Sequence, residues 1–219
     1  MTLQGQKIAL WGMVAMSSTS QQSKADPDEP YSKEEQKILL EIAEQSIEHG
    51  LNQGCSLPIQ TAQYPETLQA TRATFVTLKK QGELRGCIGT LNATRPLVND
   101  IAYNAYAAAF EDPRFPPLLA NEKDLLEISI SILSTPEAAI FTSEQALIEQ
   151  LRPGIDGLIL EDNYHRGTFL PSVWESLPDP QQFVTHLKLK AGLSADYWSG
   201  SIKVKKYTTF SFTSNLKNH

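Results

Sequence analysis

The hydrophobic and polar positions of the chain follow two periods, which predict three long helices and several strands. Apolar residues recur at helical spacing after Ser32, Arg95 and Asp179, which indicates amphipathic helices. Ser32 and Glu35 fit a capping box at the start of the first helix. Gly50 is placed to end that helix. We expect each helix to bury one face against a sheet.

A period of two predicts the strands. Residues 127–133 alternate most strictly, and residues 74–78 and 84–88 flank a polar break that indicates a hairpin. Residues 155–161 and 168–170 predict a second hairpin, whose polar tip holds His165 in solvent. One final strand is expected to carry, on a single parity, Ile202, Val204, Phe210 and Phe212. Because strands and helices alternate irregularly, we predict an α+β fold.

The second arm of the first hairpin carries the most suggestive chemistry. Strand alternation would place Leu84, Gly86 and Ile88 on one face and Arg85, Cys87 and Gly89 on the other. A cation beside a thiol favours the thiolate, so Cys87 is a candidate catalytic nucleophile. Arg85 could equally bind an anionic ligand or pair with a carboxylate across the sheet. Cys87 could also be a small buried thiol, with Gly86 packed against the alanine-rich helix.

The segment Asp112-Pro113-Arg114-Phe115-Pro116-Pro117-Leu118 is stiffened by its three prolines. A stiff loop can hold Asp112 and Arg114 in a charged site. It can equally be a plain connector whose Phe115 fills the core. The other cysteine, Cys55, lacks a charged neighbour and is interpreted as a small half-buried residue.

Composition narrows the class of protein. The chain has 219 residues, with 19 basic against 25 acidic side chains and a net charge of −6. That balance argues against nucleic-acid and membrane-surface partners. No apolar run is long enough to span a membrane, and two cysteines favour a reducing, cytoplasmic location. No metal or cofactor motif is present. We expect residues 1–30 to be a disordered leader or to follow a mis-assigned start, residues 31–212 to form the domain, and residues 213–219 to be a flexible tail.

Leu84-Arg85-Gly86-Cys87-Ile88-Gly89-Thr90 resembles the hallmark of the AMMECR family, called system protein A of the AmmeMemoRadiSam group in microbes. The resemblance extends over nearly all of residues 31–212 and is supported at residues 112–118, 126–133, 154–158, 168–174 and 190–193. It implies an α+β fold with a larger and a smaller lobe and a cleft between them. It also implies gene neighbours encoding a radical S-adenosylmethionine enzyme and a Memo-like, dioxygenase-related protein.

The resemblance supplies no reaction. Our leading expectation is that a small anionic substrate or a partner protein binds in a cleft near Arg85 and Cys87, in a modification pathway shared with the radical enzyme. The remaining expected binding residues are Gly86, Gly89, Asp112 and Arg114. The alternative is a non-catalytic protein-interaction module in which Cys87 is purely structural.

Overall fold

The structure is a computed structural model that describes residues 30–214. Within that range the chain forms helices and two four-stranded antiparallel sheets, which confirms the α+β class. The expected leader lies outside the described residues, as does the expected tail after Ser214. No helix of residues 30–214 has the length and hydropathy to cross a membrane.

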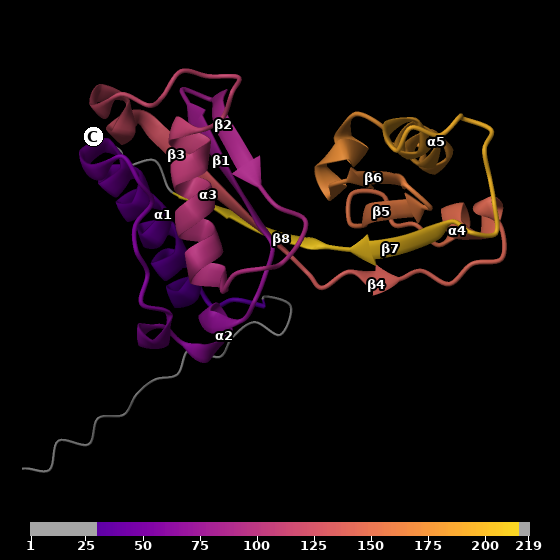
Figure 1. The fold of residues 1–219 in the computed structure, drawn as a ribbon, viewed down its shortest axis with the longest axis horizontal. Coiled ribbons are helices and arrows are strands. Elements are labelled where there is room, and N and C mark those ends of the chain that lie inside the picture. The colour runs from indigo at the N-terminus through magenta and orange to yellow at the C-terminus, as the bar shows by residue number, and fades with distance from the viewer. Residues whose placement is uncertain (1–29, 215–219) are drawn as a thin grey trace, which may run out of the picture.

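The first sheet has the strand order β2-β1-β3-β8 and carries its helices on one face (Figure 1). Its strands are β1 (Thr74–Lys80), β2 (Glu83–Gly89), β3 (Leu126–Leu133) and β8 (Thr209–Thr213). The helices α1 (Lys33–Gln53) and α3 (Leu97–Phe110) pack on each other and on the sheet, while η1 (Thr61–Gln63) and α2 (Glu66–Gln69) lie in the connection between α1 and β1. This core includes Leu39, Ile47, Val76, Leu78, Ile101 and Ile130.

The second sheet has the strand order β4-β7-β5-β6 and its own core. Its strands are β4 (Glu137–Ala138), β5 (Gly157–Asp162), β6 (His165–Phe169) and β7 (Lys203–Tyr207). The helices here are α4 (Glu144–Glu149) and α5 (Pro180–Lys190), with the 3-10 helix η3 (Pro171–Glu175) before α5. The other 3-10 helix, η2 (Ala120–Leu125), belongs with the first sheet, where it precedes β3 and contacts α1. The core includes Leu147, Leu158, Trp174, Phe183 and Val204.

The predicted start of α1 is confirmed, but its predicted end is wrong. Ser32 and Glu35 make both hydrogen bonds of the capping box. The helix continues past Gly50 to Gln53. A glycine is needed at position 50 for packing, because a Cβ there would overlap the rings of Tyr106 and Phe110 on α3. Gly54, with φ of 70°, ends the helix in the left-handed conformation.

The single final strand expected near the C-terminus is in fact two strands in different sheets. β7 pairs with β4 and β5 in the second sheet, and β8 pairs with β3 in the first. In Figure 1 they form the yellow ribbon that runs from one sheet to the other. Val204 and Phe210 lie an even number of positions apart, as the prediction of one strand required. Val204 nevertheless packs in the core of the second sheet and Phe210 against the core of the first. Local alternation could not reveal that change of partner.

A third hydrophobic cluster joins the two sheets. The first sheet and its loops contribute Ala73, Phe75, Leu91 and Leu133, and the second sheet and its loops contribute Ile159, Leu170 and Tyr207. Tyr207 immediately precedes the point where the chain passes into β8. The junction is therefore apolar packing as well as a covalent crossing.

The pairing of β2 with β1 contradicts the face assignments predicted for Arg85 and Leu84. Leu78 pairs with Gly86 but Lys79 pairs with Leu84, so Arg85 is the extra residue of a β-bulge. Cys87 pairs with Thr77, and Leu84 pairs with Lys79 on that same face. The bulge removes Arg85 from the alternation, and the predicted common face of Arg85 and Cys87 is wrong.

Gly86 lies against the backbone of α3, as the alanine-rich sequence of that helix suggested. A Cβ at this position would overlap the carbonyl oxygen of Ala108. The overlap is with main chain, which cannot swing aside as the end of a flexible side chain can. Gly86 thus sets how closely α3 approaches β2.

We expect Gly86→Ala to lower the free energy of unfolding by about 1–3 kcal/mol, the usual cost of overpacking a well-packed site. Gly200→Ala is the matched control, because a Cβ there has nothing within 4 Å. Urea denaturation of both variants measures the difference. Equal unfolding midpoints for the two variants would show that this close approach is not a constraint.

Candidate functional site

Cys87 lies on β2, the edge strand of the first sheet, on the face opposite α1 and α3. Its thiol is half-buried, and the hydroxyl of Thr77 donates a hydrogen bond to its Sγ at 3.2 Å. Serine and threonine continue along this face, where Ser131 contacts Ser211 and Thr213 donates to Ser129. We call it the hydroxyl face; it comprises Thr77, Cys87, Ser129, Ser131, Ser211 and Thr213.

The backbone of Cys87 is held by Asp112 and Arg114 from the proline-rich loop. The Cys87 amide donates to Asp112 Oδ2 at 2.8 Å, and Arg114 Nη2 donates to the Cys87 carbonyl at 3.2 Å. The two side chains are also paired, with Arg114 Nη2 2.6 Å from Asp112 Oδ2 and Nε 2.9 Å from Oδ1. We call this arrangement the Asp112–Arg114 clasp. It occupies the position of a fifth strand and satisfies an edge amide and carbonyl.

Electrostatics stabilise the clasp. The hydrogen bond from Arg114 is the main reason that the pKa of Asp112 lies well below its usual range, although burial opposes the shift. The same bond raises the pKa of Arg114. The carboxylate is buried, whereas the Arg114 side chain is 54% exposed. The loop therefore holds a charged pair, one of the two roles expected for it.

Arg85 points to a different set of partners. Its Nε and Nη2 donate to the carboxylate of Glu122 at 3.2 and 3.0 Å, and Nη2 also donates to the carbonyl of Pro116 at 3.0 Å. Lys80 contacts the same carboxylate at 2.7 Å. These bonds, that of Arg85 first, lower the pKa of Glu122 to about 2. Arg85 thus pairs with a carboxylate, as one alternative held, but that carboxylate lies on η2 and not across the sheet.

Sequence reasoning missed Glu122 and Thr77. Glu122 stands 37 residues from Arg85 in the chain, and no local pattern links the two. Thr77 could have been found as the cross-strand neighbour of Cys87, had the register of the hairpin been assigned. The cation that contacts Cys87 is Arg114, and it does so through the backbone carbonyl.

The second expected glycine, Gly89, also has a packing role. It pairs with Phe75, and a Cβ on Gly89 would overlap the Phe75 ring. Phe75 belongs to the apolar cluster that joins the two sheets. Since Thr77 and Cys87 form the next pair along the same face, the thiol borders the junction.

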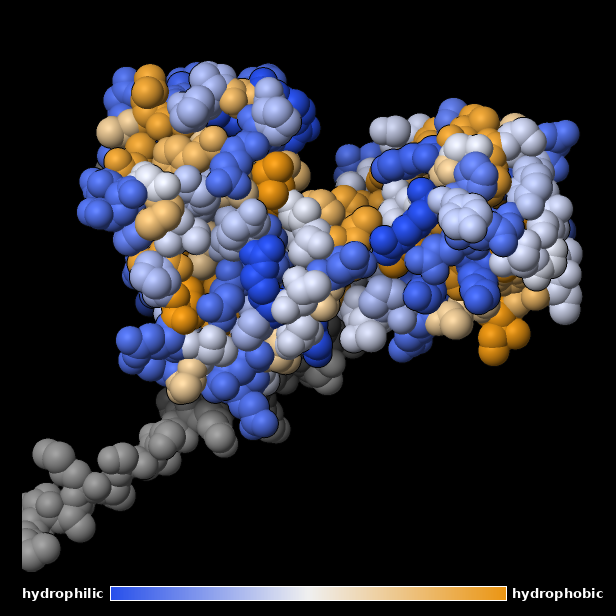
Figure 2. Space-filling model, viewed as in Figure 1, coloured by the Kyte–Doolittle hydropathy of each residue, from blue (hydrophilic) through white to orange (hydrophobic). Residues whose placement is uncertain are grey.

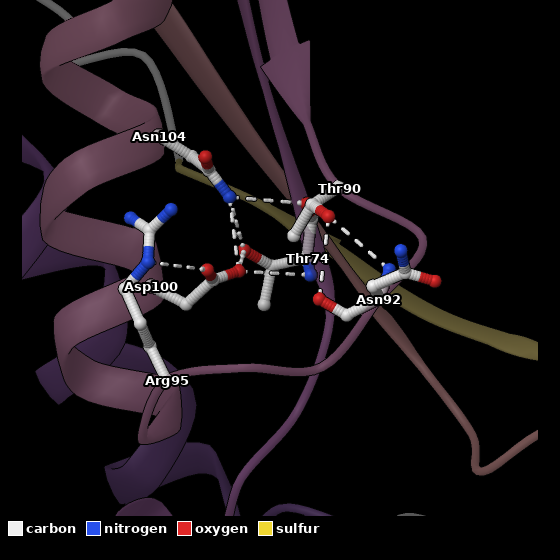
Figure 3. Close-up of polar contacts among 6 residues, drawn as sticks. All are labelled: Thr74, Thr90, Asn92, Arg95, Asp100 and Asn104. Carbon is white, nitrogen blue, oxygen red and sulfur yellow. Dashed lines mark hydrogen bonds and ion pairs between the residues drawn. The ribbon is translucent and has the colours of Figure 1, made fainter.

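A buried polar network, drawn in Figure 3, lies where β1 and α3 begin. Asp100 is fully buried, and its Oδ2 accepts from the amide and hydroxyl of Thr74 at 3.1 and 2.7 Å and from Asn104 at 3.0 Å. Its Oδ1 has no hydrogen-bond partner and lies 3.7 Å from Arg95 Nε. Burial raises the pKa of Asp100 in spite of these contacts. Sequence analysis did not single out this residue, because it lies within an ordinary amphipathic helix.

Asp100 acts as an anchor between α3 and β1. It fixes Thr74, whose carbonyl in turn accepts from the amide of Thr90 at 3.0 Å, just after β2 (Figure 3). The carboxylate thereby ties the first turn of α3 to both strands of the first hairpin. We interpret it as part of the frame that positions β2.

Cys55 differs from its predicted half-buried state. It is exposed, and its Sγ lies 3.9 Å from His49 Nδ1. The same nitrogen contacts the Cys55 carbonyl at 2.9 Å. Among residues 30–214, no group of three or more His, Cys, Asp and Glu side chains is placed to hold a metal ion.

Comparison with known proteins places this geometry in a family context. The AMMECR1 family model matches residues 40–212. A protein of Methanothermobacter thermautotrophicus is 36% identical over 172 residues, spanning 76% of this chain and 87% of the relative. One of Thermofilum pendens is 35% identical over 194 residues, spanning 80% and 88%. The crystal structure of an uncharacterised protein from Pyrococcus horikoshii aligns with a TM-score of 0.73 and 32% identity over 84% of this chain and 94% of that one.

The buried carboxylate predicts a pH effect. Because the pKa of Asp100 is raised in the folded state, its contribution favours folding below about pH 4, the unfolded pKa of an aspartate, and is lost as pH rises through the folded pKa. We therefore expect wild type to lose stability relative to Asp100→Asn as pH rises from 4 to 7. Urea titrations at several pH values measure this difference, with exposed Asp124→Asn as control. A difference that stays constant or grows in favour of wild type would contradict the assignment.

Proposed function

The chain belongs to the AMMECR1 family, and we propose that it binds a small substrate with an anionic group where the hydroxyl face meets the second sheet. In this proposal Arg114 contacts the anionic group of the substrate. The Cys87 thiol, which is the candidate nucleophile, lies beside the bound substrate. The observation that carries it is the clasp: an exposed guanidinium is held against the backbone of a half-buried cysteine.

Arg114 is suited to bind a ligand without leaving Asp112. A guanidinium has five N–H donors in a rigid fork. Arg114 donates to Asp112 and to the Cys87 carbonyl through Nε and Nη2, so the Nη1 donors can take an anion. A carboxylate or phosphate matches this donor geometry better than a neutral group does.

The cleft expected from the family resemblance is part of the proposal. Figure 2 shows the molecular surface hollowed between the first sheet with its helices and the second sheet. The junction cluster lies between the sheets and includes Phe75, on which Gly89 packs. Cys87 lies two residues before Gly89, on the same face of β2. We propose that the ligand site in this hollow has the hydroxyl face as one wall.

In the proposal, the other expected binding residues position Arg114 and β2 and do not contact the ligand themselves. Asp112 orients Arg114, and Gly86 and Gly89 allow the close packing that places β2. Arg85 holds the Pro116 carbonyl and Glu122, so it orders the loop that carries the clasp. The radical S-adenosylmethionine enzyme and the Memo-like protein remain predictions of the family resemblance.

One observation favours the non-catalytic module. Both hallmark glycines are explained by contacts within the chain, so neither needs a ligand to account for it. In that reading Cys87 is one more packed residue. The two readings differ in the reactivity of the thiol toward an anionic reagent.

The test compares alkylation of native protein by neutral iodoacetamide and anionic iodoacetate, with each cysteine followed by peptide mass spectrometry. Exposed Cys55 is the internal reference. We expect the iodoacetate-to-iodoacetamide rate ratio to be about 5-fold higher at Cys87 than at Cys55, since a unit charge about 4 Å away in water contributes about 1 kcal/mol.

Arg114→Gln should remove this difference at Cys87 and leave the ratio at Cys55 unchanged. Arg72→Gln, on a different part of the first sheet's frame, is the matched control and should change neither ratio. Equal ratios at the two cysteines of wild type, or no native-state modification of Cys87, would overturn the anion-binding proposal and favour the structural role.

A further inference from the structure

A second surface, on the far edge of the second sheet, has the properties of a docking site. A pocket of about 400 Å³ lies beside β4 and β7, with apolar and aromatic walls that include Ile140, Phe141, Trp198 and Ile202. The rings of Phe141 and Trp198 are in contact, with centroids 5.7 Å apart. Ile140, which also lines the pocket, is 91% exposed and extends its apolar surface.

The charge of this pocket is opposite to that of the whole chain. Its lining includes Lys203 and Lys205 and no acidic residue, whereas the net charge of the chain is −6. Lys205 lies 3.8 Å from Glu161, a carboxylate already 3.2 Å from Arg166, so that acid is shared by two cations. Both lysines project from the same face of β7, where they can reach a bound anion.

The strand beside the pocket has one side without a partner strand in the described chain. β4 is the edge of the second sheet and pairs only with β7. The following residue, Ala139, still donates its amide to the Val204 carbonyl at 2.8 Å, so the backbone stays extended toward Ile140. A strand edge next to an apolar pocket is the arrangement used to bind extended peptides by strand addition.

We propose that this surface binds an extended segment of a partner protein that carries apolar side chains flanked by acidic residues. The segment lies along the edge of β4 at Glu137–Ala138, because the Ile140 carbonyl beyond it already accepts from Gln150 at 3.1 Å. One apolar side chain enters the pocket beside the contacting rings of Phe141 and Trp198, and the carboxylates of the segment contact Lys203 and Lys205. Charge complementarity selects an acidic segment over a basic one. The surface is separate from the Cys87 site and does not depend on the function proposed for it.

The experiment uses the full chain and a fluorescein-labelled six-residue peptide with Leu-Phe at its centre and two acidic residues on each side. Fluorescence anisotropy measures binding. A second peptide keeps Leu-Phe and replaces the acids with lysine, and a third keeps the acids and replaces Leu-Phe with Ser-Ser. We expect at least 10-fold weaker binding of both altered peptides.

The double variant Lys203→Glu, Lys205→Glu should bind the first peptide at least 10-fold more weakly than wild type. Ile140→Ser should also weaken binding of this peptide without unfolding the chain, because Ile140 is exposed. Lys37→Glu, at an exposed position on α1, is the charge control and should have no effect. Binding that is equal for all three peptides, or unaffected by the changes at Lys203, Lys205 and Ile140, would overturn the proposal.

Discussion

The hydrogen bond from the Cys87 amide to Asp112 is the contact on which the candidate site depends. An edge strand exposes backbone groups that need partners, and here a carboxylate and a guanidinium supply them. Because Asp112 is buried and paired with Arg114, its negative charge is retained and its position is fixed. The same two side chains thus supply partners to the edge of β2 and hold a cation against the backbone of Cys87.

Contacts between the first sheet and α3 hold β2, and with it Cys87, in place. Gly86 allows α3 to approach β2, and Asp100 ties the first turn of the same helix to Thr74 on β1. Arg85 and Glu122 hold the loop on the other side of the bulge. The second sheet completes the surroundings through the junction cluster, and the passage from β7 to β8 ties it covalently to the first. The proposed site at Cys87 and the proposed docking surface at the β4 edge therefore lie on different sheets of the same chain.

Much of this fold could be predicted from local pattern, and the failures have physical causes. The capping box at Ser32, the two hairpins and the alternation of β3 depend on neighbouring residues, and all are confirmed. The prediction that α1 ends at Gly50 failed because that glycine is required by the packing of two rings from α3. The prediction of one final strand failed because β7 and β8 pair with strands of different sheets. The common face predicted for Arg85 and Cys87 failed because Arg85 is the extra residue of a bulge. That bulge could not be predicted, since a one-residue register shift leaves no mark on the hydrophobic period. Asp112 and Arg114 were expected at the site, but their contact with the backbone of Cys87 is visible only in three dimensions.

The most direct measurement of the central claim is hydrogen exchange at the Cys87 amide, followed by NMR in wild type and in Asp112→Ala. If the clasp replaces a neighbouring strand, this edge amide is protected in wild type and loses at least 10-fold of its protection in the variant, while the amides of Val76 and Thr77 on β1 keep theirs. Fast exchange of the Cys87 amide in wild type, or unchanged exchange in Asp112→Ala, would contradict the account.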